Sequence, residues 1–171
     1  MKPLSQKSSR HSKIAGDFGE MLVLYYLSRY GLECARIDHT GIDLLARTEA
    51  EEKPWGISVK TASREESRKK KARTLSGSDI EAAERACIAF NATPYLAIVH
   101  DEIDSVCVLL CSIEELKKER MDKKTFRFSF NEKYRKEYRS KKFSGRFIEM
   151  SVELGAWLKE SDKMPVPTTV S

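Results

Sequence analysis

The order of helical and extended patterns constrains the fold of this chain most. Residues 14–30 carry apolar side chains at helical spacing, and Gly31 is placed to end that helix. Three extended segments follow, at 33–38, 42–48 and 55–61. Gly16 and Gly19 have no side chains, so the backbone of the first helix can pack closely against a sheet built from these segments.

A second helix is predicted over 79–91. Ser78 and Glu81 have the spacing of a capping box at its start, and Pro94 stops it. Two apolar strands follow, at 95–100 and 105–111, and their runs are typical of strands buried on both faces. The order helix, three strands, helix, two strands predicts an α/β fold with a mixed sheet.

The remaining segments divide the chain into one domain with extensions. We expect a mobile basic arm at 1–12, a single domain at 13–160 and a disordered tail at 161–171. Within the domain we expect a core at 13–111 and a basic extension at 113–160. Residues 62–76 are predicted to be a basic, polar loop. In the extension we predict helices at 113–120, 131–140 and 152–160, and strands at 126–130 and 146–150.

Charge and cysteine usage narrow the class of protein. The 171 residues have a formal net charge of +5, which suits a polyanionic partner. No apolar run approaches the roughly 18 residues needed to cross a bilayer, and the first ten residues lack the hydrophobic segment of a secretory signal. The four cysteines have no zinc-binding spacing, so reduced thiols in a cytoplasmic protein are expected.

The segment 55–61 combines apolar and polar residues in strict alternation. Ile57 and Val59 are predicted to point into the core, while Ser58 and Lys60 point to the opposite face. An apolar strand rarely carries a lysine without a use for it. This second face is therefore interpreted as a polar edge or cleft.

The preceding strand contributes a carboxylate. Ile42 and Leu44 are expected on one face and Asp43 on the other. The short connection predicts antiparallel pairing with the next strand, which would place Asp43 beside Ser58 and Lys60. A plain salt bridge between Asp43 and Lys60 across adjacent strands is the alternative interpretation.

Glu20 lies on the same face of the first helix as Leu24 and Leu27. A partly buried carboxylate there needs compensation, either from a metal ion near Asp43 or from pairing with Lys13. Carboxylates, carbonyls and water suit a hard cation such as Mg²⁺ or Mn²⁺. Such an ion polarises a phosphodiester and activates water, and a neighbouring lysine can orient that water.

Taken together, these residues resemble the PD-(D/E)XK nuclease superfamily, in its Holliday-junction-resolvase and restriction-endonuclease-like branch. The resemblance covers roughly residues 13–111, and its carriers are Gly16-Asp17-Phe18-Gly19-Glu20, Gly41-Ile42-Asp43, Ser58-Val59-Lys60 and Pro94-Tyr95-Leu96-Ala97-Ile98. It implies a restriction-endonuclease-like core, a mixed sheet flanked by helices. It further implies that Asp43 binds metal, that Lys60 assists the attacking water and that Glu20 supports the metal site. A homodimer is a further expectation from the resemblance.

Ser58 departs from the family pattern, which has Glu, Asp or Gln two residues before the lysine. Three interpretations stay open. Glu20 supplies the missing carboxylate; or Ser58 binds the metal directly or through water; or the site has lost metal and catalysis while the fold still binds nucleic acid.

Two basic regions add to this picture. The loop after Lys60 carries Arg64, Arg68, Lys69, Lys70, Lys71 and Arg73. These cations are interpreted as a nucleic-acid contact beside the site, with a solvated loop as the alternative. The extension at 117–146 is also strongly basic and is interpreted as facing phosphates, or else as a solvated helical face.

Three functional hypotheses follow. The first is a divalent-metal-dependent endonuclease that hydrolyses DNA. The second is a catalytically inactive module on the same fold that binds nucleic acid or protein without cleavage. The third is a structural or interaction protein whose charges are surface features.

Overall fold

The computed structural model describes residues 9–63, 72–102, 105–119, 125–140 and 145–151. A six-stranded sheet forms its centre, in the order β1-β2-β3-β5-β6-β8. Its strands are β1 (Glu33–His39), β2 (Ile42–Arg47), β3 (Trp55–Ser63), β5 (Thr93–Asp101), β6 (Ser105–Ser112) and β8 (Arg146–Ser151). β3 and β5 are parallel, while the other neighbours are antiparallel, so the predicted mixed sheet is confirmed.

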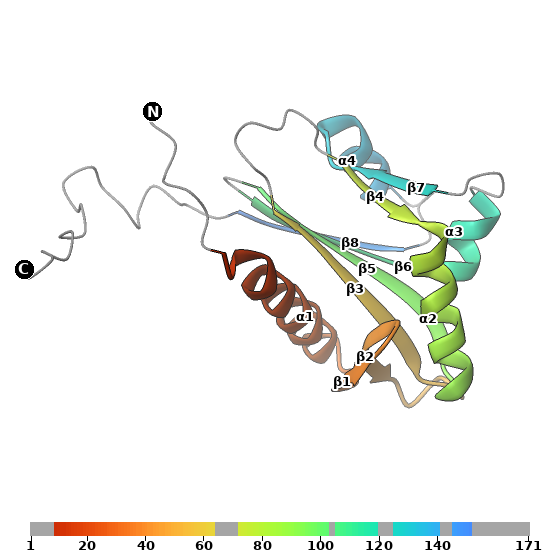
Figure 1. Cartoon of the computed structure of the whole chain (residues 1–171). Helices are drawn as coiled ribbons and strands as arrows, with labels where there is room; N and C mark the ends of the chain where they lie inside the picture. The colour runs from red at the N-terminus through yellow and green to blue at the C-terminus, as the bar shows by residue number, and fades with distance from the viewer. Residues whose placement is uncertain (1–8, 64–71, 103–104, 120–124, 141–144, 152–171) are drawn as a thin grey trace, which may run out of the picture.

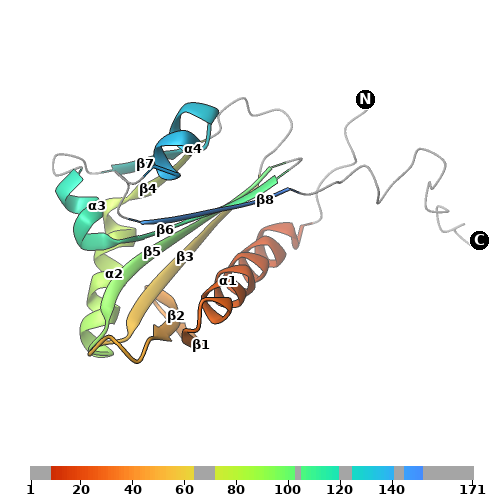
Figure 2. The same cartoon turned by 180° about the vertical axis from the view of Figure 1, so that it is seen from behind.

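Helices cover both faces of this sheet (Figure 1; Figure 2). α1 (His11–Arg29) lies on one face. On the other lie α2 (Gly77–Ala89), α3 (Ile113–Glu119), α4 (Glu132–Tyr138) and a two-stranded sheet of β4 (Ala72–Ser76) and β7 (Thr125–Ser129). The fold class is therefore the predicted one, an α/β fold with a mixed sheet flanked by helices.

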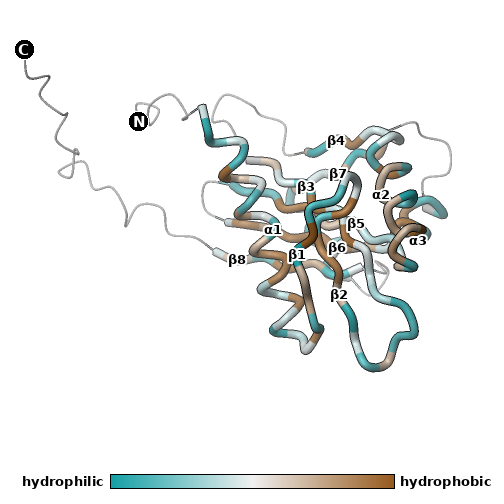
Figure 3. The backbone as a smooth tube through the Cα atoms, turned by 60° about the horizontal axis from the view of Figure 1, so that its bottom comes forward, coloured by the Kyte–Doolittle hydropathy of each residue, from teal (hydrophilic) through white to brown (hydrophobic). Residues whose placement is uncertain are grey.

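Two hydrophobic clusters, one on each side of the sheet, form the core. The cluster under α1 includes Leu22, Val23 and Leu27 of that helix with side chains of β2, β3, β5 and β6. The cluster on the other side joins α2, α3, α4, β4 and β7 to the sheet. In Figure 3 the brown, apolar stretches run through the middle of the molecule, where the central strands lie. The middle strands are consequently buried on both faces, as their apolar runs predicted.

Both helical layers approach β3 closely at a glycine. A Cβ added to Gly19 of α1 would lie 1.9 Å from Oγ1 of Thr61, and one added to Gly56 of β3 would lie 2.4 Å from Sγ of Cys87 in α2. No other residue fits at these two positions without movement of a neighbour. The close approach predicted for Gly19 is confirmed, and β3 is clamped between α1 and α2.

The structure corrects several sequence expectations. Part of the predicted loop 62–76 is strand, because β3 extends to Ser63 and β4 begins at Ala72. The capping box of α2 is formed by Ser76 and Asp79 rather than by Ser78 and Glu81. On α1 the side chains of Ile14, Phe18, Met21 and Tyr25 are exposed, although their spacing predicted the helix.

Other expectations fall partly outside the described residues. α1 begins at His11, so the arm expected at 1–12 overlaps the helix at its end, and its remainder is not described. The helix expected at 152–160 and the tail at 161–171 are not described either. Among the described helices, none is both long and apolar enough to cross a membrane.

Candidate functional site

Strand β3 lies between β2 and β5, and its side chains alternate between the two helical layers. Ile57 and Val59 belong to the hydrophobic cluster under α1. Ser58 and Lys60 alternate with them and therefore point toward the layer of α2. The predicted separation of an apolar pair from a polar pair on β3 is confirmed.

Asp43 lies at the point where β2 and β3 separate. The backbone pairing between the two strands ends at Leu44. Asp43 continues it with its side chain, because Oδ2 accepts a hydrogen bond of 2.6 Å from the main-chain N–H of Val59. The carboxylate is thus held against the backbone of β3 between Ser58 and Lys60.

The strand that carries Asp43 is twisted more than the sequence predicted. Ile42 belongs to the cluster under α2 and Leu44 to the cluster under α1, so the expectation that they share a face is wrong. The pairing of β1 with β2 shifts between Arg36 and His39, and such a bulge increases the local twist of a strand. Asp43 therefore lies at a turning point of β2 rather than on a regular face.

Ser58 is almost fully buried, with 2% of its surface exposed. Its Oγ has no hydrogen-bond partner among the described residues. Burying an unpaired hydroxyl costs about 1–3 kcal/mol, and such groups in a folded protein call for an explanation. Position 58 thus carries no negative charge but offers a hydroxyl that can donate to, or accept from, a ligand.

Lys60 reaches the first turn of α2. Its Nζ lies 3.8 Å from Oδ1 of Asp79, and no ion pair between Lys60 and Asp43 is found within the described part of the chain. The other oxygen of Asp79 accepts hydrogen bonds from the main-chain N–H of Ser76, at 3.1 Å, and from its hydroxyl, at 2.7 Å. The start of α2 therefore brings a carboxylate to the face of β3 that carries Ser58 and Lys60.

The environment of Asp79 stabilises its charged form. The hydrogen bond from the Ser76 side chain lowers the pKa of Asp79 most, and partial burial opposes this shift. The Ser76 main-chain N–H and the positive charges of Lys60 and Arg73 lower the pKa further. Asp79 is consequently an anion at neutral pH, placed between two cations.

Glu20 lies on α1 and has a different partner. Its Oε2 accepts a hydrogen bond from Arg36 of β1 at 2.6 Å, and Asp17 lies 3.9 Å from the same guanidinium. The side chain of Glu20 is half-buried, as predicted, but the cation that compensates it is Arg36 rather than Lys13. The structure thus brings Asp43 to Ser58 and Lys60, and pairs Glu20 with β1.

The residues present fit a metal ion only in a limited way. Among the described residues, no three or more His, Cys, Asp or Glu side chains are grouped to hold a metal ion. Mg²⁺ is usually held by one or two carboxylates together with water and substrate phosphates, so it does not need such a group. The Asp43 carboxylate lies on β2, and the Ser58 hydroxyl, which has no partner among the described residues, lies on β3. Together they suit an ion held mainly by water and substrate oxygens.

Of the six predicted nucleic-acid contacts in the basic loop, Arg73 is the one that lies within the described residues. It lies in β4, its Nε is buried, and that atom has no hydrogen-bond partner among the described atoms. The other five predicted nucleic-acid contacts, Arg64, Arg68, Lys69, Lys70 and Lys71, lie outside the described residues. The charges of Arg73 and Lys60 both lower the pKa of Asp79, so β4 contributes a positive charge close to the candidate site.

Part of the basic extension serves the fold instead. Arg135 of α4 forms an ion pair of 2.8 Å with Glu102 and another with Glu149 of β8. Arg139 pairs with the same Glu149. These ion pairs tie α4 to the sheet, and the buried Arg135 guanidinium is not available to phosphates.

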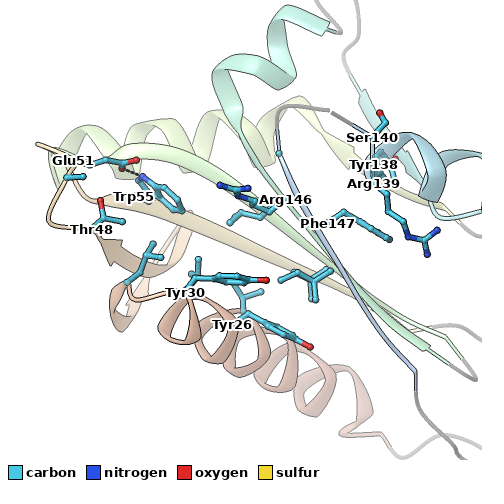
Figure 4. A pocket seen from close by; sticks show the side chains of 18 residues that line it. Tyr26, Tyr30, Thr48, Glu51, Trp55, Tyr138, Arg139, Ser140, Arg146 and Phe147 are labelled. Atoms are coloured by element: carbon cyan, nitrogen blue, oxygen red, sulfur yellow. Dashed lines mark hydrogen bonds between the residues drawn. The ribbon is translucent and has the colours of Figure 1, made fainter. Parts of the chain in front are cut away.

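A separate cavity of about 880 Å³ is lined by residues of α1, β3, β6 and β8 and by Tyr138, Arg139 and Ser140 at the end of α4. Tyr26 and Tyr30 of α1, Trp55 of β3 and Phe147 of β8 line it, and Figure 4 shows Arg146 beside them. Its lining contains none of Glu20, Asp43, Ser58, Lys60 and Asp79. The candidate site at β3 and α2 is therefore separate from this cavity.

Asp79 is the residue that the sequence interpretation missed. Its signal was the spacing Ser76-x-x-Asp79, a second capping-box pattern two residues before the one chosen. The sequence offers two capping-box patterns, and the choice depends on where the preceding strand ends. β4 ends at Ser76, which makes Ser76 the cap, but this segment was predicted to be a loop.

Comparison with known proteins gives a limited result. No protein family matches the chain, and no curated protein matches it. Among solved structures, the chain is similar to the Holliday junction resolvase Hjc of the archaeal hyperthermophile Archaeoglobus fulgidus, at 20% sequence identity and a TM-score of 0.49. The match covers 67% of this chain and 83% of that chain.

Proposed function

We propose that this protein binds nucleic acid and hydrolyses DNA phosphodiester bonds as a divalent-metal-dependent endonuclease of the PD-(D/E)XK type. One observation carries the proposal: the Asp43 carboxylate is held on the Val59 N–H, between Ser58 and Lys60. A carboxylate from β2 beside a hydroxyl and an ammonium from β3 form a group suited to phosphodiester chemistry.

Each residue has a defined role in this proposal. Asp43 and the Ser58 hydroxyl hold the cation, with Glu20 as a supporting carboxylate that would have to leave Arg36. Lys60 orients the attacking water or stabilises the charge that develops on the phosphate. Mg²⁺ or Mn²⁺, when bound, would polarise the phosphodiester and lower the pKa of a coordinated water.

The basic residues supply the nucleic-acid contact in this proposal. Arg73 lies near the site, and Arg64, Arg68, Lys69, Lys70 and Lys71 precede it in the sequence. Contacts of this kind with phosphates release counterions, so binding should weaken as the salt concentration rises. A homodimer and a cytoplasmic location are part of the same proposal, and light scattering of the purified chain tests the dimer.

Asp43→Asn tests the catalytic role. An asparagine side chain can still accept the hydrogen bond from Val59, so the strand pairing is retained while the negative charge is lost. Wild-type protein with Mg²⁺ or Mn²⁺ is expected to cleave plasmid, branched or single-stranded DNA, and the variant is expected to lose this activity. Glu52→Gln is the matched control, because Glu52 is an exposed carboxylate in the loop after β2 and its loss should leave cleavage unchanged.

The second candidate function is nucleic-acid binding without cleavage. Two observations favour it: Ser58 carries no charge, and no three or more His, Cys, Asp or Glu side chains are grouped to hold a metal within the described ranges. Intact DNA under every metal tested, together with salt-sensitive DNA binding, would establish this function. A chain that binds neither DNA nor RNA at low salt would exclude both candidates and leave a structural role.

A further inference from the structure

The first turn of α2 forms a charged cluster with β3 and β4. β4 ends at Ser76, and Ser76 caps the helix through a reciprocal pair of hydrogen bonds with Asp79. Lys60 of β3 lies 3.8 Å from Asp79, and Arg73 of β4 contributes a second positive charge. The hydroxyl of Ser58, which has no hydrogen-bond partner in the described part of the chain, lies on the same face of β3 as Lys60.

We propose that Asp79 is a positioning residue of the candidate site, which holds the Lys60 ammonium in place on the α2 side of β3. The inference rests on the proposed function, since it assigns a role within the same site. It gives the site a carboxylate that position 58 does not provide, from a different element of the fold.

The direction of the side chains on β3 favours Asp79 over Glu20 for this role. Ser58 and Lys60 point to the layer of α2, and Asp79 lies on the first turn of that helix. Glu20 lies on α1, on the other side of the sheet, and is paired with Arg36 at 2.6 Å. A carboxylate on α2 therefore meets Lys60 without any rearrangement of an existing ion pair.

The capping box explains why Asp79 can hold another side chain in place. Oδ2 is fixed by two hydrogen bonds from Ser76, which leaves Oδ1 directed at Lys60. A lysine has a flexible four-carbon stem, and its ammonium stays in one position only if something fixes it. The rigid helix start thus orders the ammonium of Lys60, and a phosphate could then be met by Lys60 and Arg73 together.

Amine acetylation followed by mass spectrometry tests the positioning directly, without any need for enzymatic activity. In Asp79→Asn, labelling of Lys60 is expected to rise about twofold to fivefold, the range that a half-exposed ion pair supports. Asp79→Glu keeps both the cap and the charge, and should return labelling to the wild-type level. Glu81→Gln removes an exposed carboxylate two residues further along α2 and should change nothing. Unchanged labelling in Asp79→Asn, or an equal rise in Glu81→Gln, overturns the proposal.

DNA cleavage by the full chain separates this inference from the proposed function. If the wild type cleaves, Asp79→Asn should lower kcat about tenfold to a hundredfold with little change in KM, because a misplaced group slows chemistry more than binding. Asp79→Glu should restore most of this loss, whereas wild-type kcat in Asp79→Asn overturns the inference. If the wild type neither cleaves nor binds DNA, the proposed function fails, and the labelling of Lys60 still decides whether Asp79 positions it.

Discussion

Two ion pairs of this protein show how differently the same chemistry can be used. Arg135 and Glu102 pair at 2.8 Å with side chains only 10% and 2% exposed. Lys60 and Asp79 pair at 3.8 Å with side chains 28% and 38% exposed. The first pair is short and dry, and the second is long and partly open to solvent.

The neighbours of the two pairs differ in the same way. Arg135 also donates from Nε to the carbonyl of Phe130 at 2.7 Å and from Nη1 to Glu149, so this guanidinium is held by the protein on several sides. Among the described residues, Lys60 has one ion-pair partner, Asp79, and its three donors exceed what one carboxylate oxygen can accept. Lys60 therefore has donors left to bind a ligand, and the Ser58 hydroxyl, which has no partner among the described residues, lies on the same face of β3. Arg135, in contrast, holds α4 on the sheet through Glu102 and Glu149.

Loss of Arg135 should have the largest effect on stability. Arg135→Met leaves Glu102 and Glu149 without their shared cation, and breaking one side of a buried pair costs about 3–5 kcal/mol. Urea unfolding followed by circular dichroism measures the change. Lys136→Met is the matched control, because Lys136 is an exposed cation on the same helix and should cost less than about 0.5 kcal/mol. Equal losses in the two variants would show that the buried ion pairs of Arg135 contribute no more stability than an exposed lysine.

Gly19→Ala tests the clamp that holds β3 beside the Lys60 pair. The added Cβ would meet Thr61 Oγ1 at 1.9 Å, and an overpacked contact of this kind costs about 1–3 kcal/mol. Gly16→Ala is the control, because nothing lies within 4 Å of its Cβ position, and it should be neutral or stabilising. Thermal denaturation measures the stability of both variants, and only Gly19→Ala should unfold at a lower temperature than the wild type. A second change, Thr61→Ala, should recover part of the loss, and no recovery would place the strain elsewhere.

The core and the candidate site could not be predicted equally well from the sequence. The helices and strands of the core were predictable from helical spacing, apolar runs and local start and stop signals, and the pairing of the strand that carries Asp43 with β3 followed from a short connection. The twist that separates Ile42 from Leu44 was hidden, since it depends on a bulge in the β1–β2 pairing. Partners that lie far apart in the sequence, such as Lys60 with Asp79 and Glu20 with Arg36, depend on packing that no local pattern records.

Loss of Lys60 should cost little, in contrast to Arg135. Lys60→Met removes a long, half-exposed ion pair, which contributes about 0–1 kcal/mol to the free energy of unfolding. The methionine keeps much of the aliphatic stem, so packing is largely retained. Urea unfolding under the conditions used for Arg135→Met gives the comparison. A loss above about 2 kcal/mol would mean that Lys60 is structural, because surface pairs do not reach that value.

The smallest effect concerns the charge of Asp79 at acid pH. Its pKa in the folded protein is lowered, chiefly by the Ser76 hydrogen bond, below the value of about 3.9 expected in the unfolded chain. The charge therefore stabilises the folded state above that unfolded-state pKa, and this contribution is lost as the pH falls through the folded-state pKa. Wild type should exceed Asp79→Asn in stability at pH 6, and urea unfolding should show the difference shrinking toward pH 3. Ser76→Ala removes the main cause of the shift, so acid should destabilise this variant less steeply than the wild type. If the difference between wild type and Asp79→Asn stays constant with pH, the charge of Asp79 makes no contribution, and its value to the fold lies in the helix cap alone.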